Sequence, residues 1–165
     1  MSQPAMVDSL MGTALQAGAT ELKPAAKSLW GYGGVVEAPD GNIWKVATSA
    51  KRNTGPDTGQ IDAFVLLLGT TDVAASKQFY VANGLPVARS FGRKYVEFQA
   101  APGAVQLALY GRKALAKVAG VAPDGTGSHR LVINADHGSF VDPDGFAWAP
   151  SAHHQTEEQR ASSNA

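Results

Sequence analysis

The spacing of apolar residues predicts a helix at the start of the chain. From Val7 to Leu15 the apolar side chains recur every three or four positions, the stripe of an amphipathic helix, and Gly18 marks its end. Alternating and β-branched residues then predict three short strands, separated by turn residues. These strands are Thr20 to Lys23, Tyr32 to Glu37 and Asn42 to Thr48. Residues 1–50 therefore form a helix followed by three strands.

A polar segment rich in turn residues, 51–60, is the best linker in the sequence, and a second unit follows it over residues 61–111. Its first strand is predicted at Ala63 to Leu68. Asp72 is a suitable N-cap for the next helix, which Asn83 and Gly84 end. The strands predicted after it are Val87 to Phe91, Lys94 to Gln99 and Val105 to Tyr110. The order is strand, helix and three strands.

The rest of the chain contains less regular structure. Residues 112–128 are a connector with a helical turn at Lys113 to Val118, and residues 129–150 hold a strand, His129 to Ala135, and a hairpin, Phe140 to Trp148. Residues 151–165 are polar and are expected to form a disordered tail.

One sequence pattern occurs twice. In both copies Pro-Asp-Gly is followed by Trp three residues after the Gly, which places Trp44 after Gly41 and Trp148 after Gly145. Two copies with matched flanks favour a duplicated module.

The composition narrows the classes of function. The chain has 165 residues, of which 44% are apolar and 17% charged, as in ordinary globular proteins. Lys plus Arg equals Asp plus Glu at 14 each, which argues against nucleic acid and membrane partners. There is no cysteine, no apolar run long enough to span a bilayer and no secretory signal pattern, so we expect a cytoplasmic protein without disulfides.

Several segments together resemble the glyoxalase/bleomycin-resistance/extradiol dioxygenase (vicinal-oxygen-chelate) superfamily. Gly69 to Tyr80 is similar to the family's opening strand-to-helix turn, and Val105 to Leu115 is similar to the close of a first module. The segments that resemble the close of a second module are Gly18 to Pro24, Trp30 to Gly34 and Ala38 to Trp44. The resemblance covers most of residues 7–150. It implies an α+β fold in which paired βαβββ modules form a curved mixed sheet with helices on its outer face.

The order of the segments departs from the family's order. The apparent first strand of the second module, from His129, lies near the C-terminus, whereas its helix and three strands lie at the N-terminus. We therefore interpret the chain as circularly permuted, or as a homodimer that exchanges segments, so that residues 129–150 complete the module of residues 1–50. The alternative is a gene fragment whose N-terminal half-module only caps the sheet.

The metal site that the resemblance implies is incomplete. By position, the family's four ligands fall at Val65, Ala108, His129 and Lys45, of which only His129 could bind a metal. A lone imidazole is a weak anchor, and an ammonium group repels a divalent cation. We expect no metal and no cofactor.

Aromatic residues are the candidates for lining a ligand cavity, because their rings provide broad contact with a polar tip. The candidate ligand-binding residues are Trp30, Tyr32, Trp44, Tyr95, Phe98 and Tyr110. For each ring, ordinary core packing is the alternative. Trp30 and Tyr32 are favoured, because the glycines around them would leave backbone accessible to a ligand.

The candidate catalytic pair is His129 and Lys45. Strand alternation places His129 with Leu131 and Ile133 on one face. This would leave the polar Arg130 and Asn134 toward the helices, unless the strand lies near an edge or the register is off by one. If the pair shares the concave face, His129 could act as an acid or base and Lys45 could stabilise an oxyanion.

Three functions remain open on the sequence alone. The first is a binding protein that sequesters a small, partly aromatic drug or metabolite without chemistry. The second is a metal-independent lyase, isomerase or hydrolase that uses His129. The third is a structural or regulatory subunit with a filled cavity.

Overall fold

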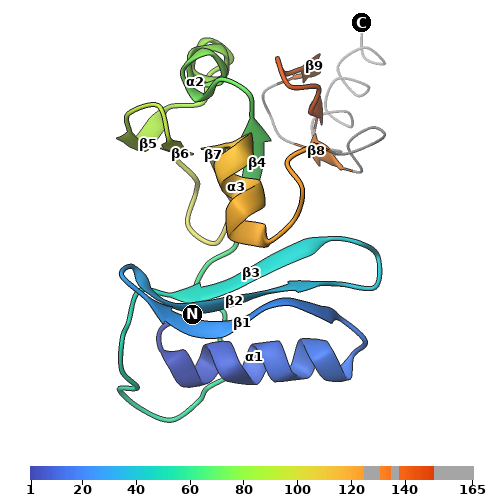
Figure 1. Cartoon of the computed structure of the whole chain (residues 1–165). Coiled ribbons are helices and arrows are strands. Elements are labelled where there is room, and N and C mark those ends of the chain that lie inside the picture. The colour runs from blue at the N-terminus through green and yellow to red at the C-terminus, as the bar shows by residue number, and fades with distance from the viewer. Residues whose placement is uncertain (125–130, 135–137, 151–165) are drawn as a thin grey trace, which may run out of the picture. The chain divides into compact units, whose positions relative to one another are not determined.

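The computed structural model describes residues 1–124, 131–134 and 138–150, and the chain divides into two compact units (Figure 1). Unit 1 comprises Met1–Val65, Pro102–Val105 and Lys113–Pro123. Unit 2 comprises Leu66–Ala101, Gln106–Arg112 and Asp124–Ala165. Helices and strands are both present in the described residues, so the α+β class is confirmed.

Unit 1 begins with a helix that packs on an antiparallel sheet of order β1-β2-β3. Its first elements are α1 (Pro4–Gln16), β1 (Thr20–Ser28), β2 (Gly31–Glu37) and β3 (Ile43–Thr48). Val7 and Met11 on the inner stripe of α1 pack against Val36 and Val46 of the sheet. The predicted helix and three strands are confirmed, but β1 continues past Pro24. The pairing of β1 with β2 shifts register on both sides of Lys23. Such a shift is expected beside Pro24, because proline has no N–H to donate to the neighbouring strand.

The glycines of β2 serve close packing, which corrects the expectation that they leave backbone open to a ligand. A Cβ added at Gly34 would lie 2.6 Å from Met11 Cε, and one added at Gly33 would lie 2.6 Å from the Val46 carbonyl oxygen. At Gly31, where φ is +136°, the added Cβ would meet the Thr48 carbonyl oxygen. The space beside these glycines is therefore already filled by the chain itself.

Residues 51–60 contain no helix or strand, yet they are held firmly against the start of α1. The Gln3 side chain, in a residue that is 2% exposed, donates to the carbonyl oxygens of Gly55 and Pro56 and accepts from the backbone N–H groups of Thr54 and Gly55. These contacts fix the path of the chain toward Ile61.

The predicted helical turn after residue 112 is a full helix, α3 (Arg112–Ala119). Lys23 of β1 donates its ammonium protons to the carbonyl oxygens of Lys117 and Val118, the latter at 2.7 Å. A cation at this end satisfies carbonyls that have no partner within the helix. Lys23 thus attaches α3 to β1.

Unit 2 contains one βαβββ module, in the order that the resemblance predicts. Its elements are β4 (Val65–Thr70), α2 (Val73–Ala82), β5 (Val87–Phe91), β6 (Tyr95–Phe98) and β7 (Gln106–Gly111), with sheet order β4-β7-β6-β5. Asp72 caps α2 as predicted, because its carboxylate accepts from the N–H groups of Ala74 and Ala75. The N–H bonds from Ala75 and Ala74 hold the pKa of Asp72 below its ordinary value.

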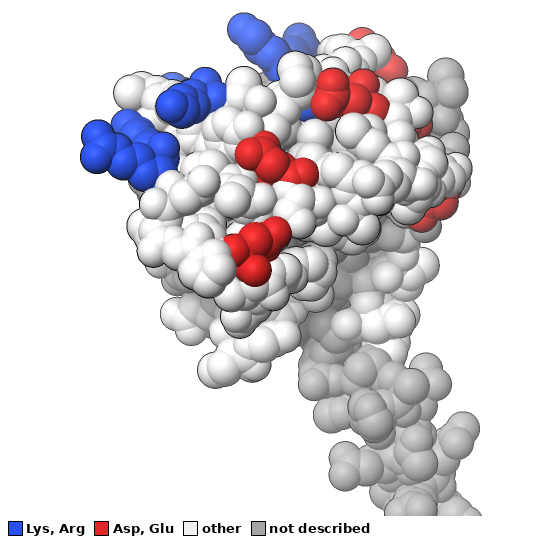
Figure 2. All heavy atoms as spheres, turned by 90° about the horizontal axis from the view of Figure 1, so that it is seen from below, with Lys and Arg blue, Asp and Glu red and all other residues white. Residues whose placement is uncertain are grey.

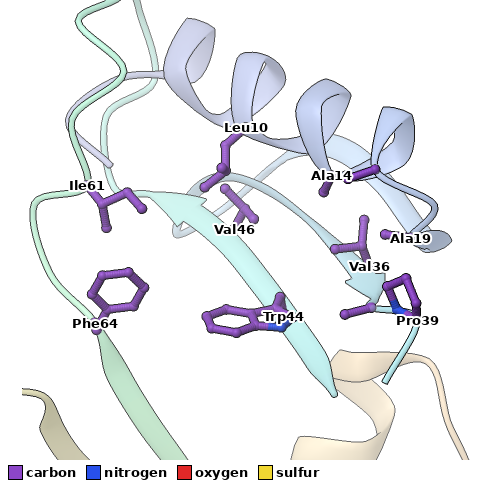
Figure 3. A pocket seen from close by; sticks show the side chains of 11 residues that line it. Leu10, Ala14, Ala19, Val36, Pro39, Trp44, Val46, Ile61 and Phe64 are labelled. Atoms are coloured by element: carbon purple, nitrogen blue, oxygen red, sulfur yellow. The ribbon is translucent and has the colours of Figure 1, made fainter. Parts of the chain in front are cut away.

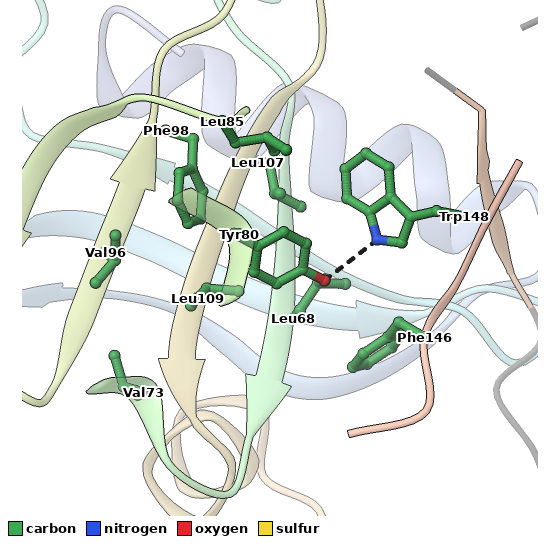
Figure 4. Packing of buried hydrophobic residues seen from close by; sticks show 10 residues of the cluster. All are labelled: Leu68, Val73, Tyr80, Leu85, Val96, Phe98, Leu107, Leu109, Phe146 and Trp148. Atoms are coloured by element: carbon green, nitrogen blue, oxygen red, sulfur yellow. Dashed lines mark hydrogen bonds between the residues drawn. The ribbon is translucent and has the colours of Figure 1, made fainter. Parts of the chain in front are cut away.

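The core of unit 2 lies between α2 and one face of this sheet (Figure 4). Strand alternation places Val96 and Phe98 of β6, and Leu107 and Leu109 of β7, on the side of Tyr80. The buried members of the cluster are Leu68, Val73, Tyr80, Leu85, Val96, Phe98, Leu107, Leu109, Phe146 and Trp148.

A third sheet joins the same core. It contains β8 (Val132–Asn134), β9 (Phe140–Val141) and β10 (Ala147–Ala149) in the order β8-β10-β9, with β10 parallel to β8 and antiparallel to β9. The predicted hairpin is confirmed. Leu131 and Ile133 pack against the core, whereas Val132 and Asn134 are exposed, so the polar side of the strand faces outward. That residues 129–150 complete the module of residues 1–50 stays a prediction.

Hydrogen bonds to Asp142 and Asp144 anchor the turn at Pro143-Asp144-Gly145. Asp142 accepts from the Tyr80 hydroxyl at 2.7 Å, and that hydroxyl also accepts from the Trp148 indole N–H at 3.2 Å (Figure 4). Asp144 accepts from the Thr71 N–H at 2.8 Å and pairs with Arg112 at 2.9 Å. Burial, followed by the bond to Asp142, raises the pKa of Tyr80.

Neither the surface charge nor the helices of the described residues point to a particular kind of partner. Figure 2 draws one face of the molecule, on which basic and acidic side chains are both present among a broad uncharged area. Within the described ranges, none of the helices has the length and apolar character needed to cross a bilayer.

Candidate ligand-binding face and apolar groove

The face of the unit 2 sheet that points away from the core carries polar and aromatic side chains. We call this surface the tyrosine face. It consists of Arg89, Phe91, Tyr95, Glu97, Gln106 and Tyr110. Strand alternation creates it, because Tyr95 and Glu97 alternate along β6 with the buried Val96 and Phe98. The backbone pairs Tyr95 with Tyr110 and Arg89 with Glu97, so residues from three strands lie side by side.

Glu97 lies at the centre of the tyrosine face. One carboxylate oxygen accepts from Arg89 at 2.7 Å and from the Tyr95 hydroxyl at 2.8 Å, and the other accepts from the Gln106 amide at 3.0 Å. Burial alone would raise the pKa of Glu97, but the hydrogen bonds from Arg89 and Tyr95 and the charge of Arg89 outweigh it. The pKa is therefore below its ordinary value, and Glu97 is a fixed anion at neutral pH.

Aromatic rings surround this carboxylate. Tyr95 and Tyr110 meet edge to face with ring centroids 6.0 Å apart, and Phe91 lies 6.0 Å from Tyr95 on the other side. The Arg89 guanidinium lies 5.8 Å from the centre of the Phe91 ring. Burial, and then the hydrogen bond to Glu97, raises the pKa of Tyr95 to about 12. Tyr95 therefore stays protonated and donates to Glu97 at every physiological pH.

Three of the four positions that the resemblance assigns to metal ligands lie in the described residues, namely Val65, Ala108 and Lys45. Ala108 of β7 is paired with Glu97 of β6, and Val65 begins β4. Within the described ranges no group of three His, Cys, Asp or Glu side chains could hold a metal ion. Glu97 instead accepts hydrogen bonds from an arginine, a tyrosine and a glutamine. Polar side chains of this kind bind the functional groups of small organic ligands.

Unit 1 contains an apolar groove of about 330 Å³ between α1, the side chains of β2 and β3 that face it, and residues 61–64 (Figure 3). Trp44 and Val46 project into it from β3, and Ile61 and Phe64 form the opposite wall. Trp44 and Phe64 lie edge to face with centroids 6.3 Å apart. The full lining is Leu10, Ala14, Ala17, Ala19, Val36, Ala38, Pro39, Trp44, Val46, Ile61 and Phe64. None of these side chains carries a charge.

The structure brings only some of the predicted site residues together. Tyr95 and Tyr110 meet on the tyrosine face, and Trp44 lines the apolar groove. Phe98 does not face the ligand side, because it is 1% exposed on the opposite surface of β6. Trp30 is 84% exposed in the turn between β1 and β2, away from the groove lining.

The remaining predicted residues have different surroundings. Tyr32 donates its hydroxyl proton to Asp8 at 2.7 Å, and this hydrogen bond is the main reason that the pKa of Tyr32 is raised. Lys45 is exposed on β3. His129 lies outside the described residues, so its pairing with Lys45 stays a prediction.

Sequence reasoning missed four residues of the tyrosine face: Arg89, Phe91, Glu97 and Gln106. The alternation of Tyr95-Val96-Glu97-Phe98 contains the signal for Glu97, since a strand with an apolar core side places Glu97 beside Tyr95. Arg89 and Gln106 depend on the register between strands, which a single sequence does not specify.

Several solved structures are similar to this chain. Among them, a glyoxalase-related enzyme from Fulvimarina pelagi has a TM-score of 0.44 and 18% identity over 52% of this chain and 84% of that one. A hypothetical protein from S. aureus has a TM-score of 0.45 and 20% identity over 55% of this chain and 92% of that one. Lactoylglutathione lyase from Agrobacterium tumefaciens has a TM-score of 0.39 and 17% identity over 52% of this chain and 88% of that one. No family model and no curated protein matches the sequence.

Proposed function

We propose that this protein binds a small organic molecule with a planar aromatic part on the tyrosine face. The observation that carries the proposal is the fixed Glu97 carboxylate with Tyr95, Tyr110 and Phe91 around it. Aromatic side chains provide flat contact area at little entropic cost, and a few oriented polar groups give specificity. The protein would hold its ligand by contact with these rings and by hydrogen bonding.

The charge of the face indicates the ligand's chemistry. A carboxylate offers about four lone-pair sites, and Glu97 uses three of them on its protein partners. The remaining site accepts a hydrogen bond, which favours a neutral or cationic aromatic compound with an N–H or O–H donor. Phenols and aromatic amines satisfy both requirements.

Binding is preferred to catalysis because the groups of the tyrosine face are held in fixed protonation states. Glu97 is anionic and Tyr95 is neutral near pH 7, whereas a general acid or base needs a pKa near the working pH. The enzymatic alternative depends on His129, which lies outside the described residues.

The test is a thermal-shift screen with phenols, aromatic amines and aromatic carboxylates, followed by calorimetric titration of the hits. At 100 times its dissociation constant a ligand adds roughly 2.7 kcal/mol to the free energy of unfolding. Glu97→Gln should weaken the best hit by about tenfold, because one charged hydrogen bond is lost. Tyr32→Phe, which removes a hydroxyl from unit 1, is the matched control and should leave the affinity unchanged. Equal affinity in Glu97→Gln and the unmodified protein would contradict the proposal.

A further inference from the structure

The apolar groove of unit 1 lies on the α1 side of the sheet (Figure 3). Trp44 and Val46 face this side, and strand alternation turns Lys45, which lies between them on β3, to the opposite side. All the residues that line the groove belong to unit 1, so it is separate from the tyrosine face of unit 2. The groove is therefore a second concave surface, with a chemistry of its own.

Small side chains leave this groove hollow. Four of the lining residues are alanines, namely Ala14, Ala17, Ala19 and Ala38. Three large apolar side chains also line it and stay partly exposed: Ile61 by 38%, Trp44 by 49% and Phe64 by 47%. Single apolar residues on a surface are ordinary, whereas large ones that gather around one hollow mark a site of interaction.

Polar contacts outside the groove hold one of its walls, residues 61–64, in place. The Asp62 carboxylate lies 3.3 Å from the ammonium group of Met1, which also donates to the Ala47 carbonyl oxygen of β3 at 3.3 Å. The hydrogen bonds of Gln3 fix the chain that leads to this wall. The wall is thus positioned before a ligand arrives, which lowers the entropic cost of binding.

The volume and the lining of the groove define what it can hold. An engineered apolar cavity of about 150 Å³ in another protein binds benzene, so the 330 Å³ of this groove has room for about two fused aromatic rings. Trp44 and Phe64, with ring centroids 6.3 Å apart, offer ring surface to such a ligand. Almost all of the lining is apolar, so a charged group would lose its water without gaining a partner.

We propose that the apolar groove is a second ligand-binding site, which takes an uncharged compound of about two aromatic rings without hydrogen-bonding groups. Water in the groove finds few polar partners on these walls, so an apolar ligand displaces it favourably. The tyrosine face instead favours a ligand with a donor for Glu97. The two sites therefore separate aromatic compounds by polarity.

Naphthalene and 2,6-naphthalenedicarboxylate are the probes. They share two fused rings, but the second carries a carboxylate at each end, so that one carboxylate must enter the groove. In a ¹H–¹⁵N spectrum naphthalene should shift amides of α1 and β3 around Trp44 along a saturating single-site curve. The dicarboxylate should bind more weakly by about tenfold or more, because its carboxylate is desolvated. Absent or unsaturable shifts, shifts centred on β5 to β7, or equal affinities would each overturn the proposal.

Two variants of the lining give an independent readout. Ala14→Leu adds an isopropyl group that projects from α1 into the groove and should weaken naphthalene binding by about tenfold or more. Phe64→Ala, in a segment without helix or strand, removes ring surface and should also weaken it. Thr13→Leu, an exposed position of α1 outside the lining, is the matched control and should bind naphthalene as the unmodified chain does.

Far-ultraviolet circular dichroism verifies that these variants remain folded. Unchanged affinity for naphthalene in folded Ala14→Leu or Phe64→Ala would contradict the proposal. Naphthalene has no donor for Glu97, so these results stand whether or not the tyrosine face binds a ligand of its own.

Discussion

Replacing Tyr80 by Phe tests the buried network that anchors the turn at Pro143-Asp144-Gly145. Tyr80 is 0% exposed, and its ring packs among Phe98, Phe140 and Trp148. The substitution keeps the ring and removes only the hydroxyl, so little cavity forms. The lost interactions are the donation to Asp142 at 2.7 Å and the acceptance from Trp148 at 3.2 Å.

The expected cost follows from these two bonds. A hydrogen bond to a charged group contributes about 1.5–3 kcal/mol, and one between neutral groups about 0.5–1.5 kcal/mol. Asp142 keeps its bonds from the N–H groups of Asp144 and Phe146, so its carboxylate remains partly satisfied. We expect Tyr80→Phe to lower the free energy of unfolding by about 2–4 kcal/mol, a large part of the roughly 5–15 kcal/mol of a typical domain.

The assay is urea unfolding followed by circular dichroism, with Tyr32→Phe as the matched control. The control removes the same atom from an exposed pair, Tyr32 with Asp8, and should cost less than about 1 kcal/mol. A loss below about 0.5 kcal/mol in Tyr80→Phe would show that the network does not hold the turn in solution.

Further predictions concern the packing of unit 1 and the tyrosine face. Gly34→Ala should lower the free energy of unfolding by about 1–3 kcal/mol, because the new methyl group would lie 3.0 Å from the backbone atoms Ala25 N and Lys23 O and would also displace Met11 Cε. Gly12→Ala, in the middle of α1 where the new methyl group meets no other atom, should raise the free energy of unfolding by up to about 1 kcal/mol. If urea unfolding shows Gly12→Ala to be less stable than Gly34→Ala, the packing described around Gly34 is contradicted. Gln3→Ala should cost about 1–3 kcal/mol and speed proteolysis within residues 51–60; an unchanged cleavage rate would argue against the anchor. Absorbance titration should show Tyr95 ionising near pH 12, and earlier in Glu97→Gln. Because the folded pKa is raised above the ordinary value of 10, the stabilisation is complete below pH 10 and is lost as the pH rises toward 12. A Tyr95 transition near pH 10 would refute the burial of this hydroxyl.

Local patterns were sufficient to predict most helices and strands. The stripe from Val7 to Leu15 and the cap at Asp72 depend only on residues close in sequence, and both are found where predicted. Strand ends were less exact: β4 begins at Val65 rather than Ala63, and β1 extends beyond Lys23. Ends depend on which neighbouring strand offers hydrogen bonds, and this is not local information.

The candidate site was harder to predict because it depends on pairing between strands. Tyr95 and Tyr110 were both identified as ligand-binding candidates, but only the pairing of β6 with β7 shows that they meet. Phe98 was misplaced because its aromatic character outweighed its place in the alternation of β6. The glycines of β2 were misread for a related reason, since their neighbours Met11 and Val46 come from distant parts of the sequence.

The most direct test of the ligand-binding face is a two-dimensional ¹H–¹⁵N spectrum recorded while the best phenol or aromatic amine is added. Binding on the tyrosine face predicts that the shifted amides cluster on β5, β6 and β7, around Tyr95 and Glu97. Shifts confined to α1 and β3, around Trp44, would place the ligand in the apolar groove and contradict the account.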